Sequence, residues 1–381
     1  MSTPIAAKAA ERNYGVDALR CVSMLLIVCL HVMNRGGAIP PVGTAASLWL
    51  YPLRILASSA VNIYALISGF VMLHGRFRPA RIFELWLQVW VLNVVIGLIG
   101  DWIDPEAMDG AFWLRYLFPF TQKAYWYFTA YVGVYAFSPL INRGVRALNR
   151  VQAIAVLWTM LLLFSLCATL GYLNQGDPFY IGGGYSVLWL TALYTVGACI
   201  RQSEFLRQIA SWRLLVLLLL TLALLTALFG VIHLPDAPDF LRSLNGRLLD
   251  YVSPLITAVS VLMLLLFSRL RFGARMRGLI AFLSPLTFGV YIIHVHHVIW
   301  IPLQGLFQPL LKLPALLLPL AVILSGVGLF TACAAADWLR ARLFRLLRVR
   351  QLADRLEKRL RRRLNQIVNQ SNGEEYGKEE N

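Results

Sequence analysis

The chain has 381 residues, of which 59% are hydrophobic and only 14% are charged, and its mean hydropathy is +0.65. Soluble globular domains are about 45–50% apolar and about 25% charged, so the composition excludes an ordinary soluble protein and favours a membrane protein. The net charge of +16 does not indicate nucleic-acid binding, because eleven Lys/Arg residues lie between Arg340 and Arg363, after a predicted membrane segment. Basic residues in that position are typical of topology signals and lipid headgroup contacts.

About ten apolar segments follow one another along the chain, and most approach the ~20 residues that a helix needs to cross a bilayer. We expect helices because lipid offers no hydrogen-bond partner to an unpaired backbone. The predicted fold is therefore an all-α polytopic membrane protein, a bundle of about ten transmembrane helices. The expected segments are residues 16–34, 55–73, 82–100, 125–141, 154–173, 185–200, 214–232, 251–267, 280–301 and 315–336.

The loop charges predict an orientation. Loops rich in Lys/Arg alternate along the chain with loops that contain most of the loop acids. Because positive residues remain in the cytoplasm, both termini are predicted to be cytoplasmic. Arg35 and Arg54, in the first predicted outer loop, are the main exceptions to this alternation.

Four regions are predicted from the composition along the chain. They are a cytoplasmic N-terminal segment (1–13), a transmembrane domain (14–338), a basic amphipathic helix (339–366) and a disordered polar tail (367–381). Leucines recur every four residues from Leu352 to Leu364, so we expect the basic helix to contact the anionic lipids of the inner leaflet. A solvated coil that only enforces topology is the alternative.

The first apolar segment contains three ionisable residues, Asp17, Arg20 and His31. Such groups are costly inside a membrane and are usually functional. Their helical spacing places Arg20 and His31 on one face, ~16 Å apart along the axis, and Asp17 at a pairing distance from Arg20. With the N-terminus inside, His31 lies deep in the membrane, where a neutral imidazole can act as a general base. The simpler interpretations are a histidine bonded to a neighbouring helix and an arginine that extends to the headgroups.

Two further arginines, Arg78 and Arg81, stand three residues apart at the start of the third predicted helix. Arginines at a helix start can bind a phosphate or pyrophosphate together with the free N–H groups there, although ordinary cytoplasmic loop charge is simpler. No glycine-rich phosphate loop occurs in the sequence, which disfavours an ATPase or kinase. Ser68 and Gly69, in the second segment, indicate close packing between helices.

The fourth and ninth segments add aromatic residues and histidines. Trp126 and Tyr127 open the fourth segment and suit either an interfacial belt or a wall for a sugar or an acyl chain. The ninth segment contains His294, His296 and His297, without the converging ligands of a zinc site or the HExxH pattern of a metalloprotease. We therefore predict no metal, and we favour His294 as a polar partner inside the bundle.

Together these residues resemble the acyltransferase-3 family of integral membrane O-acyltransferases. The hallmark of that family is a basic residue, ten intervening residues and a His in the first span, and Arg20 and His31 match it. A second hallmark, R-x-x-R in the first cytoplasmic loop, matches Arg78 and Arg81, whereas Glu84 departs from the pattern that follows it. The chain is similar to the short, single-domain members. Shorter matches are Ser68–Phe70, Trp126–Phe128, Ser138–Ile141 and Phe288–His294.

The resemblance implies transfer of an acyl group, most often acetyl, from cytoplasmic acyl-CoA to a hydroxyl of a cell-surface glycan or lipid-linked glycan precursor. Arg78 and Arg81 would bind the CoA phosphates. Arg20, with Asp17, would guide the CoA or orient the site, and His31 would be the base or a transient acyl carrier. The residues implied for substrate binding are Trp126, Tyr127, Tyr291 and His294.

The implied location is the bacterial cytoplasmic membrane, and the expected partners are acetyl-CoA, a glycan or glycolipid acceptor and membrane lipids. Two alternatives stay open. One is a succinyl- or other acyltransferase that acts on a small acceptor, and the other is a non-catalytic glycolipid transporter or flippase. A transporter would favour helices broken by Gly or Pro in two matching halves, and the sequence has no such symmetry.

Overall fold

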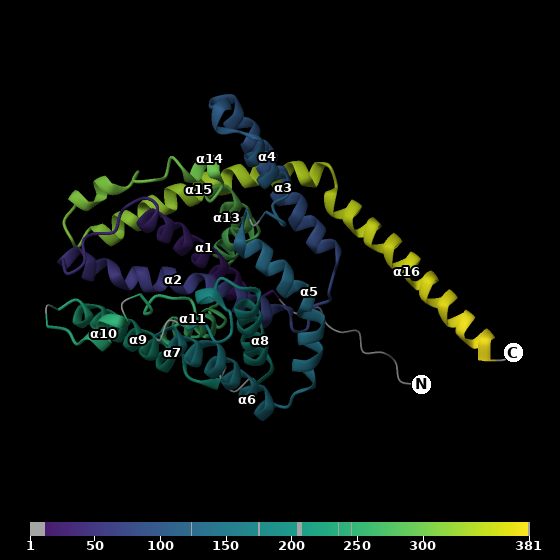
Figure 1. Ribbon diagram of the computed structural model, residues 1–381, viewed down its shortest axis with the longest axis horizontal. Coiled ribbons are helices and arrows are strands. Elements are labelled where there is room, and N and C mark those ends of the chain that lie inside the picture. Colours follow the sequence, from purple (N-terminus) through teal and green to yellow (C-terminus); the bar gives the residue numbers. More distant parts are fainter. Residues whose placement is uncertain are drawn as a thin grey trace.

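The computed structural model describes residues 12–122, 124–173, 176–203, 208–234, 236–244 and 246–379. Helices dominate this part of the chain, and no β-strand occurs in it. Figure 1 shows the helices gathered into one bundle, from which α16 extends. The α-helices are α1 (Tyr14–Asn34), α2 (Ala45–Met72), α3 (Ala80–Ile103), α4 (Gly110–Leu117), α5 (Trp126–Ala147), α6 (Arg150–Leu161), α7 (Ala168–Leu173), α8 (Val187–Ser203), α9 (Ser211–Ile232), α10 (Asp239–Ser243), α11 (Pro254–Phe267), α12 (Ala274–Leu283), α13 (Thr287–His294), α14 (His297–Trp300), α15 (Leu318–Leu346) and α16 (Val349–Glu379).

Seven helical spans in the described residues are long and apolar enough to cross a membrane, so the chain is a multi-pass membrane protein. Five of them are the single helices α1, α2, α3, α9 and α15, and two combine elements, Arg150–Gly171 and Ala274–His294. The apolar helix α11 is shorter. The all-α fold is therefore confirmed, whereas the count of about ten spans and the cytoplasmic location of both termini stay predictions.

The helix α2 begins earlier than the sequence predicts. It begins at Ala45, ten residues before the predicted start, and its N-cap residue Thr44 accepts a hydrogen bond of 3.2 Å from the N–H of Ser47. The helix continues through Pro52 and Arg54, because packing on both sides of α2 outweighs the cost of an interior proline. Arg54 therefore lies in α2 and not in a loop, whereas its predicted position toward the outer side stays a prediction.

The helix α2 is buried on two sides. Its residues belong to two hydrophobic clusters, one shared with α8, α9 and α11 and the other with α1, α13 and α15. A Cβ on Gly69 would lie 1.8 Å from the carbonyl oxygen of Tyr194, and a Cβ on Gly197 would lie 2.1 Å from that of Leu66. Only glycine allows such backbone contact, so the close helix packing predicted from Ser68 and Gly69 is confirmed.

The ninth predicted segment is interrupted and ends early. A short 3-10 turn at Ser284–Leu286 joins α12 to α13, and the span ends at His294 rather than at residue 301. The reason is a local cap, because the His296 ring accepts a hydrogen bond of 3.3 Å from the N–H of Val298 and begins α14. The cap separates His294, on α13, from His297, on α14.

The basic C-terminal helix, α16, begins after a turn at Arg348, where φ is +51°. Figure 1 shows α16 extending away from the bundle, and it continues past residue 366, where the sequence places its end. Near its start, α16 contacts α3. Its apolar stripe is exposed and consists of Leu352, Leu356, Leu360 and Leu364.

Candidate active site

One buried carboxylate organises the beginning of α1. The side chain of Asn13 caps the helix by accepting a backbone hydrogen bond, and Asp17 follows in the first turn, where a negative charge is favourable. The Asp17 carboxylate accepts hydrogen bonds from Arg20 at 3.0 Å, from Arg12, and from the Ser284 hydroxyl at 3.3 Å. The ion pair predicted between Asp17 and Arg20 is therefore present.

A cavity, here called the His31 cavity, follows the face of α1 that carries Arg20 and His31. Met24, Ile27, Leu30 and His31 line it from α1, and the spacing of Met24, Ile27 and His31 is that of one helix face. Its volume is about 80 Å³, which is room for a few small groups. Tyr64 also lines the cavity, and its hydroxyl donates a hydrogen bond of 2.8 Å to the Arg20 carbonyl oxygen. The cavity wall thus connects the surroundings of Arg20 with His31.

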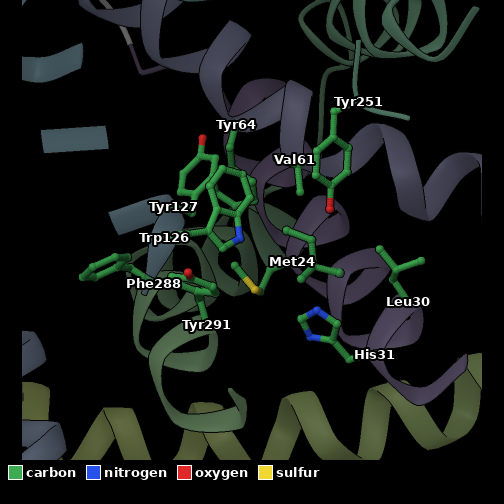
Figure 2. A pocket seen from close by; sticks show the side chains of 11 residues that line it. Met24, Leu30, His31, Val61, Tyr64, Trp126, Tyr127, Tyr251, Phe288 and Tyr291 are labelled. Carbon is green, nitrogen blue, oxygen red and sulfur yellow. The ribbon is translucent and has the colours of Figure 1, made fainter. Parts of the chain in front are cut away.

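Aromatic side chains form much of the remaining wall. Three of the four residues implied for substrate binding line the cavity, namely Trp126, Tyr127 and Tyr291. Figure 2 shows one ring nitrogen of His31 and the hydroxyl of Tyr251 turned toward the cavity interior. The structure therefore brings the predicted base together with most of the predicted substrate-binding residues.

Three aromatic residues that line the cavity were not selected from the sequence. Tyr64, Tyr251 and Phe288 also line the His31 cavity. Phe288 belongs to the Phe288–His294 match and could have been chosen from it. A tyrosine within an apolar segment carries no local pattern that distinguishes a cavity wall from the core, so no sequence signal indicated Tyr64 or Tyr251.

His294, the fourth residue implied for substrate binding, does not line the cavity but bonds to His31. His31 Nδ1 lies 2.8 Å from His294 Nε2, and His294 Nδ1 lies 2.6 Å from the carbonyl oxygen of Val290. A carbonyl oxygen can only accept, so His294 Nδ1 carries a proton, and Nε2 of the neutral ring accepts one from His31 Nδ1–H. This series of hydrogen bonds leaves the lone pair of a neutral His31 on Nε2.

Trp300 fixes the His31 ring from another side. The two rings meet edge-on, with their centroids 4.8 Å apart. Arg35, one turn after His31, donates a hydrogen bond of 3.1 Å to the Trp300 carbonyl oxygen and so connects α1 to α14. Packing and hydrogen bonding therefore hold one orientation of the imidazole.

The other two histidines of the ninth segment do not join this chain. His296 lies beyond the end of the span, and burial, with a smaller contribution from His297, lowers its pKa to about 3. His296 is therefore neutral near pH 7. The backbone N–H of His297 donates to the Tyr116 hydroxyl at 3.1 Å. Within the described ranges, no three His, Cys, Asp or Glu side chains are grouped so that they could hold a metal ion.

Arg78 and Arg81 lie at the start of α3 and do not line the His31 cavity. The Arg78 guanidinium pairs with Glu84 at 3.1 Å and with Asp354 of α16 at 2.5 Å. Glu357, one turn further along α16, accepts a hydrogen bond of 3.0 Å from the N–H of the first α3 residue. Two carboxylates of α16 thus contact the start of α3, where the sequence predicts a phosphate-binding site. Arg81 is exposed.

A family model with the description "Acyltransferase domain", which represents the acyltransferase-3 family, matches residues 13–338. The matched range includes the His31 cavity, the pair of Asp17 with Arg20, and the start of α3. No curated protein and no solved structure matches the chain.

Proposed function

The chain belongs to the acyltransferase-3 family, and from this premise we propose that it transfers an acetyl group from acetyl-CoA to a hydroxyl of a cell-surface glycan or lipid-linked glycan precursor. The observation that carries the proposal is the state of His31. Its Nδ1–H is committed to His294, its ring lines a cavity, and its remaining nitrogen is available as a base.

The reaction follows from that geometry. His31 Nε2 removes the proton of the acceptor hydroxyl as its oxygen attacks the carbonyl carbon of the thioester. The tetrahedral intermediate collapses, the C–S bond breaks, and the CoA thiolate takes the proton from the His31 imidazolium. His294 keeps accepting the Nδ1–H bond throughout and stabilises the imidazolium in one orientation. In the alternative relay, Nε2 itself attacks the thioester carbon, and the C–S bond breaks to release the CoA thiolate and leave an acyl-His31 intermediate. The acceptor hydroxyl then takes the acyl group from Nε2, and its proton passes to the thiolate.

The donor is proposed to bind at the start of α3. Arg78 and Arg81 supply guanidinium groups there, and the first N–H groups of α3 supply donors for an anion. The contacts of Asp354 with Arg78 and of Glu357 with the first N–H of α3 support the proposal, because these carboxylates occupy donors that a phosphate would also bind. Arg20 would then lie along the path of the pantetheine arm toward His31.

The small volume of the His31 cavity, about 80 Å³, supports a short acyl group such as acetyl over a long chain. The charged end of α1 and the basic helix α16 support a cytoplasmic position for both termini, and the proposed location is a bacterial inner membrane. The exposed leucine stripe of α16 supports contact with anionic lipids of the inner leaflet.

The test uses the full-length protein in liposomes with acetyl-CoA labelled in the acetyl group. The acceptors are glycolipids extracted from cells that lack the protein. We expect label in the glycan fraction with the wild type and a loss of about 100- to 10,000-fold with His31→Gln, because the general base is removed. His233→Gln is the matched control, since His233 follows the end of α9, is bonded to the Phe229 carbonyl oxygen and does not line the His31 cavity.

Each other outcome identifies an alternative. Full transfer by His31→Gln would remove the proposed role of His31. Label from succinyl-CoA alone would identify a succinyltransferase, and movement of unlabelled glycolipid without transfer would identify a flippase. Label that stays on the wild-type protein in the absence of acceptor, and is missing from His31→Gln, would establish the acyl-His31 relay.

A further inference from the structure

Arg54 occupies a costly position. It lies in the third turn of α2, inside a membrane-spanning helix. A charged side chain there is expensive and usually marks a functional site. Because Arg54 lies in a helix and not in a loop, a loop-charge topology signal does not explain it.

No carboxylate of the described chain neutralises Arg54. Arg20 and Arg78 pair with carboxylates at 3.0 Å and 2.5 Å, whereas Arg54 forms no ion pair with any residue that the structure describes. Asp250 lines the same cavity as Arg54 but pairs with Arg247 at 3.4 Å instead. The Arg54 guanidinium is therefore a positive charge that lacks its counter-ion.

Arg54 lines a second cavity, here called the Arg54 cavity. Its volume is about 260 Å³, compared with about 80 Å³ for the His31 cavity. The two cavities share Leu30 and Tyr251 in their walls, so they are neighbours. Besides Tyr251, the side chains with polar groups that line the Arg54 cavity are Asn34, Tyr51, Ser58, Tyr185 and Asp250.

Aromatic rings stand at the boundary of the two cavities. The ring centroids of Tyr185 and Tyr251 are 5.0 Å apart, and those of Trp126 and Tyr185 are 4.6 Å apart. Aromatic faces suit the apolar face of a sugar ring, and the amide and hydroxyl groups in the cavity wall can bond to its hydroxyls. The Arg54 cavity thus combines the surfaces that a saccharide needs with one unneutralised cation.

We propose that the Arg54 cavity binds an acidic saccharide, with its anionic group on Arg54 and its acceptor hydroxyl directed past Tyr251 to His31. The proposal rests on the proposed function, because it makes the Arg54 cavity the acceptor site of the same reaction. The anionic group is a phosphate or a carboxylate, and both accept two parallel N–H bonds from a guanidinium. A phosphate would come from a lipid carrier or phosphorylated sugar, and a carboxylate from a uronic acid.

The experiment measures binding without an acyl donor, so it is informative even if no acyl transfer is found. The purified full-length protein in detergent is titrated with methyl glucuronide, methyl glucoside 6-phosphate and neutral methyl glucoside, and binding is followed by ligand-observed NMR. We expect the wild type to bind at least one anionic sugar about tenfold or more tightly than the neutral one. Arg54→Gln should bind all three equally, and the control Arg143→Gln, at an exposed position on α5, should retain the preference.

The outcomes distinguish a phosphate ligand from a carboxylate ligand, and either of them from rejection of the proposal. Preference for the phosphate points to a carrier or sugar phosphate, and preference for the glucuronide points to an acidic sugar. Equal binding of the three sugars by the wild type, or a preference that survives in Arg54→Gln, overturns the proposal. Loss of folding does not confuse the result, because Arg54 has no ion-pair partner to lose, and Arg54→Gln should not lower the thermal unfolding midpoint.

Discussion

The ionisable residues at the two ends of α1 have different kinds of hydrogen-bond partner. At the first end, Arg20 is neutralised by the Asp17 carboxylate at 3.0 Å. At the second end, His31 is bonded only to neutral groups, first His294 and then the Val290 carbonyl oxygen. A carboxylate beside His31 would favour its protonated form, whereas a neutral acceptor orients the ring and leaves its lone pair available. In the proposed reaction, the charge at one end would serve binding, and the neutrality at the other would serve proton transfer.

After His31 itself, the largest effect should come from His294, which maintains the neutral end. We expect His294→Phe to lower kcat about 10- to 100-fold, because His31 Nδ1–H loses its acceptor and the ring can turn its proton toward the cavity. The KM for acetyl-CoA should stay unchanged, since His294 does not line the His31 cavity. Steady-state kinetics of acetyl transfer measure both quantities.

His294→Gln serves as the conservative control, because the amide oxygen can accept from His31 and the amide nitrogen can donate to Val290. It should recover part of the lost kcat, which a merely packing role for His294 does not predict. An unchanged kcat in His294→Phe would show that the chain from Val290 to His31 does not position the base.

The charged end should respond in stability more than in chemistry. Asp17→Asn leaves Arg12 and Arg20 without their carboxylate, so we expect the free energy of unfolding to fall by about 1–3 kcal/mol, less than for a fully buried pair because both arginines are partly exposed. Thermal unfolding followed by tryptophan fluorescence measures the change. Asp101→Asn, at the end of α3, is the control and should leave the midpoint unchanged. A midpoint equal to that of the wild type in Asp17→Asn would contradict the structural role of the pair.

The sequence predicted those parts of the site that depend on one helix. The face shared by Arg20 and His31 and the pairing of Arg20 with Asp17 follow from the helical repeat, and the polar residues stand out in an apolar segment. The contact of His31 with His294 joins residues 263 positions apart, and no local pattern specifies such pairing. The sequence placed Arg54 in a loop for a related reason. Hydropathy alone begins the segment after Pro52 and Arg54, whereas tertiary packing extends the helix back to Ala45.

The smallest effect should come from the contact between α3 and α16. It tests whether Arg78, which is paired with carboxylates as Arg20 is, also binds CoA. Arg78 already pairs with Asp354 and Glu84, so a CoA phosphate has to compete with a carboxylate of α16. Partly exposed ion pairs contribute about 0–1 kcal/mol, so Asp354→Asn should tighten CoA binding by no more than about fivefold. Arg78→Ala should weaken CoA binding. Adding Asp354→Asn to Arg78→Ala should change the affinity no further, because Asp354 then has no Arg78 guanidinium for which to compete with the phosphate. Equilibrium binding of CoA to the four proteins completes the cycle. If Asp354→Asn tightened CoA binding equally with and without Arg78, Asp354 would not act by competing for Arg78. The ion pairs of Arg78 would then be structural.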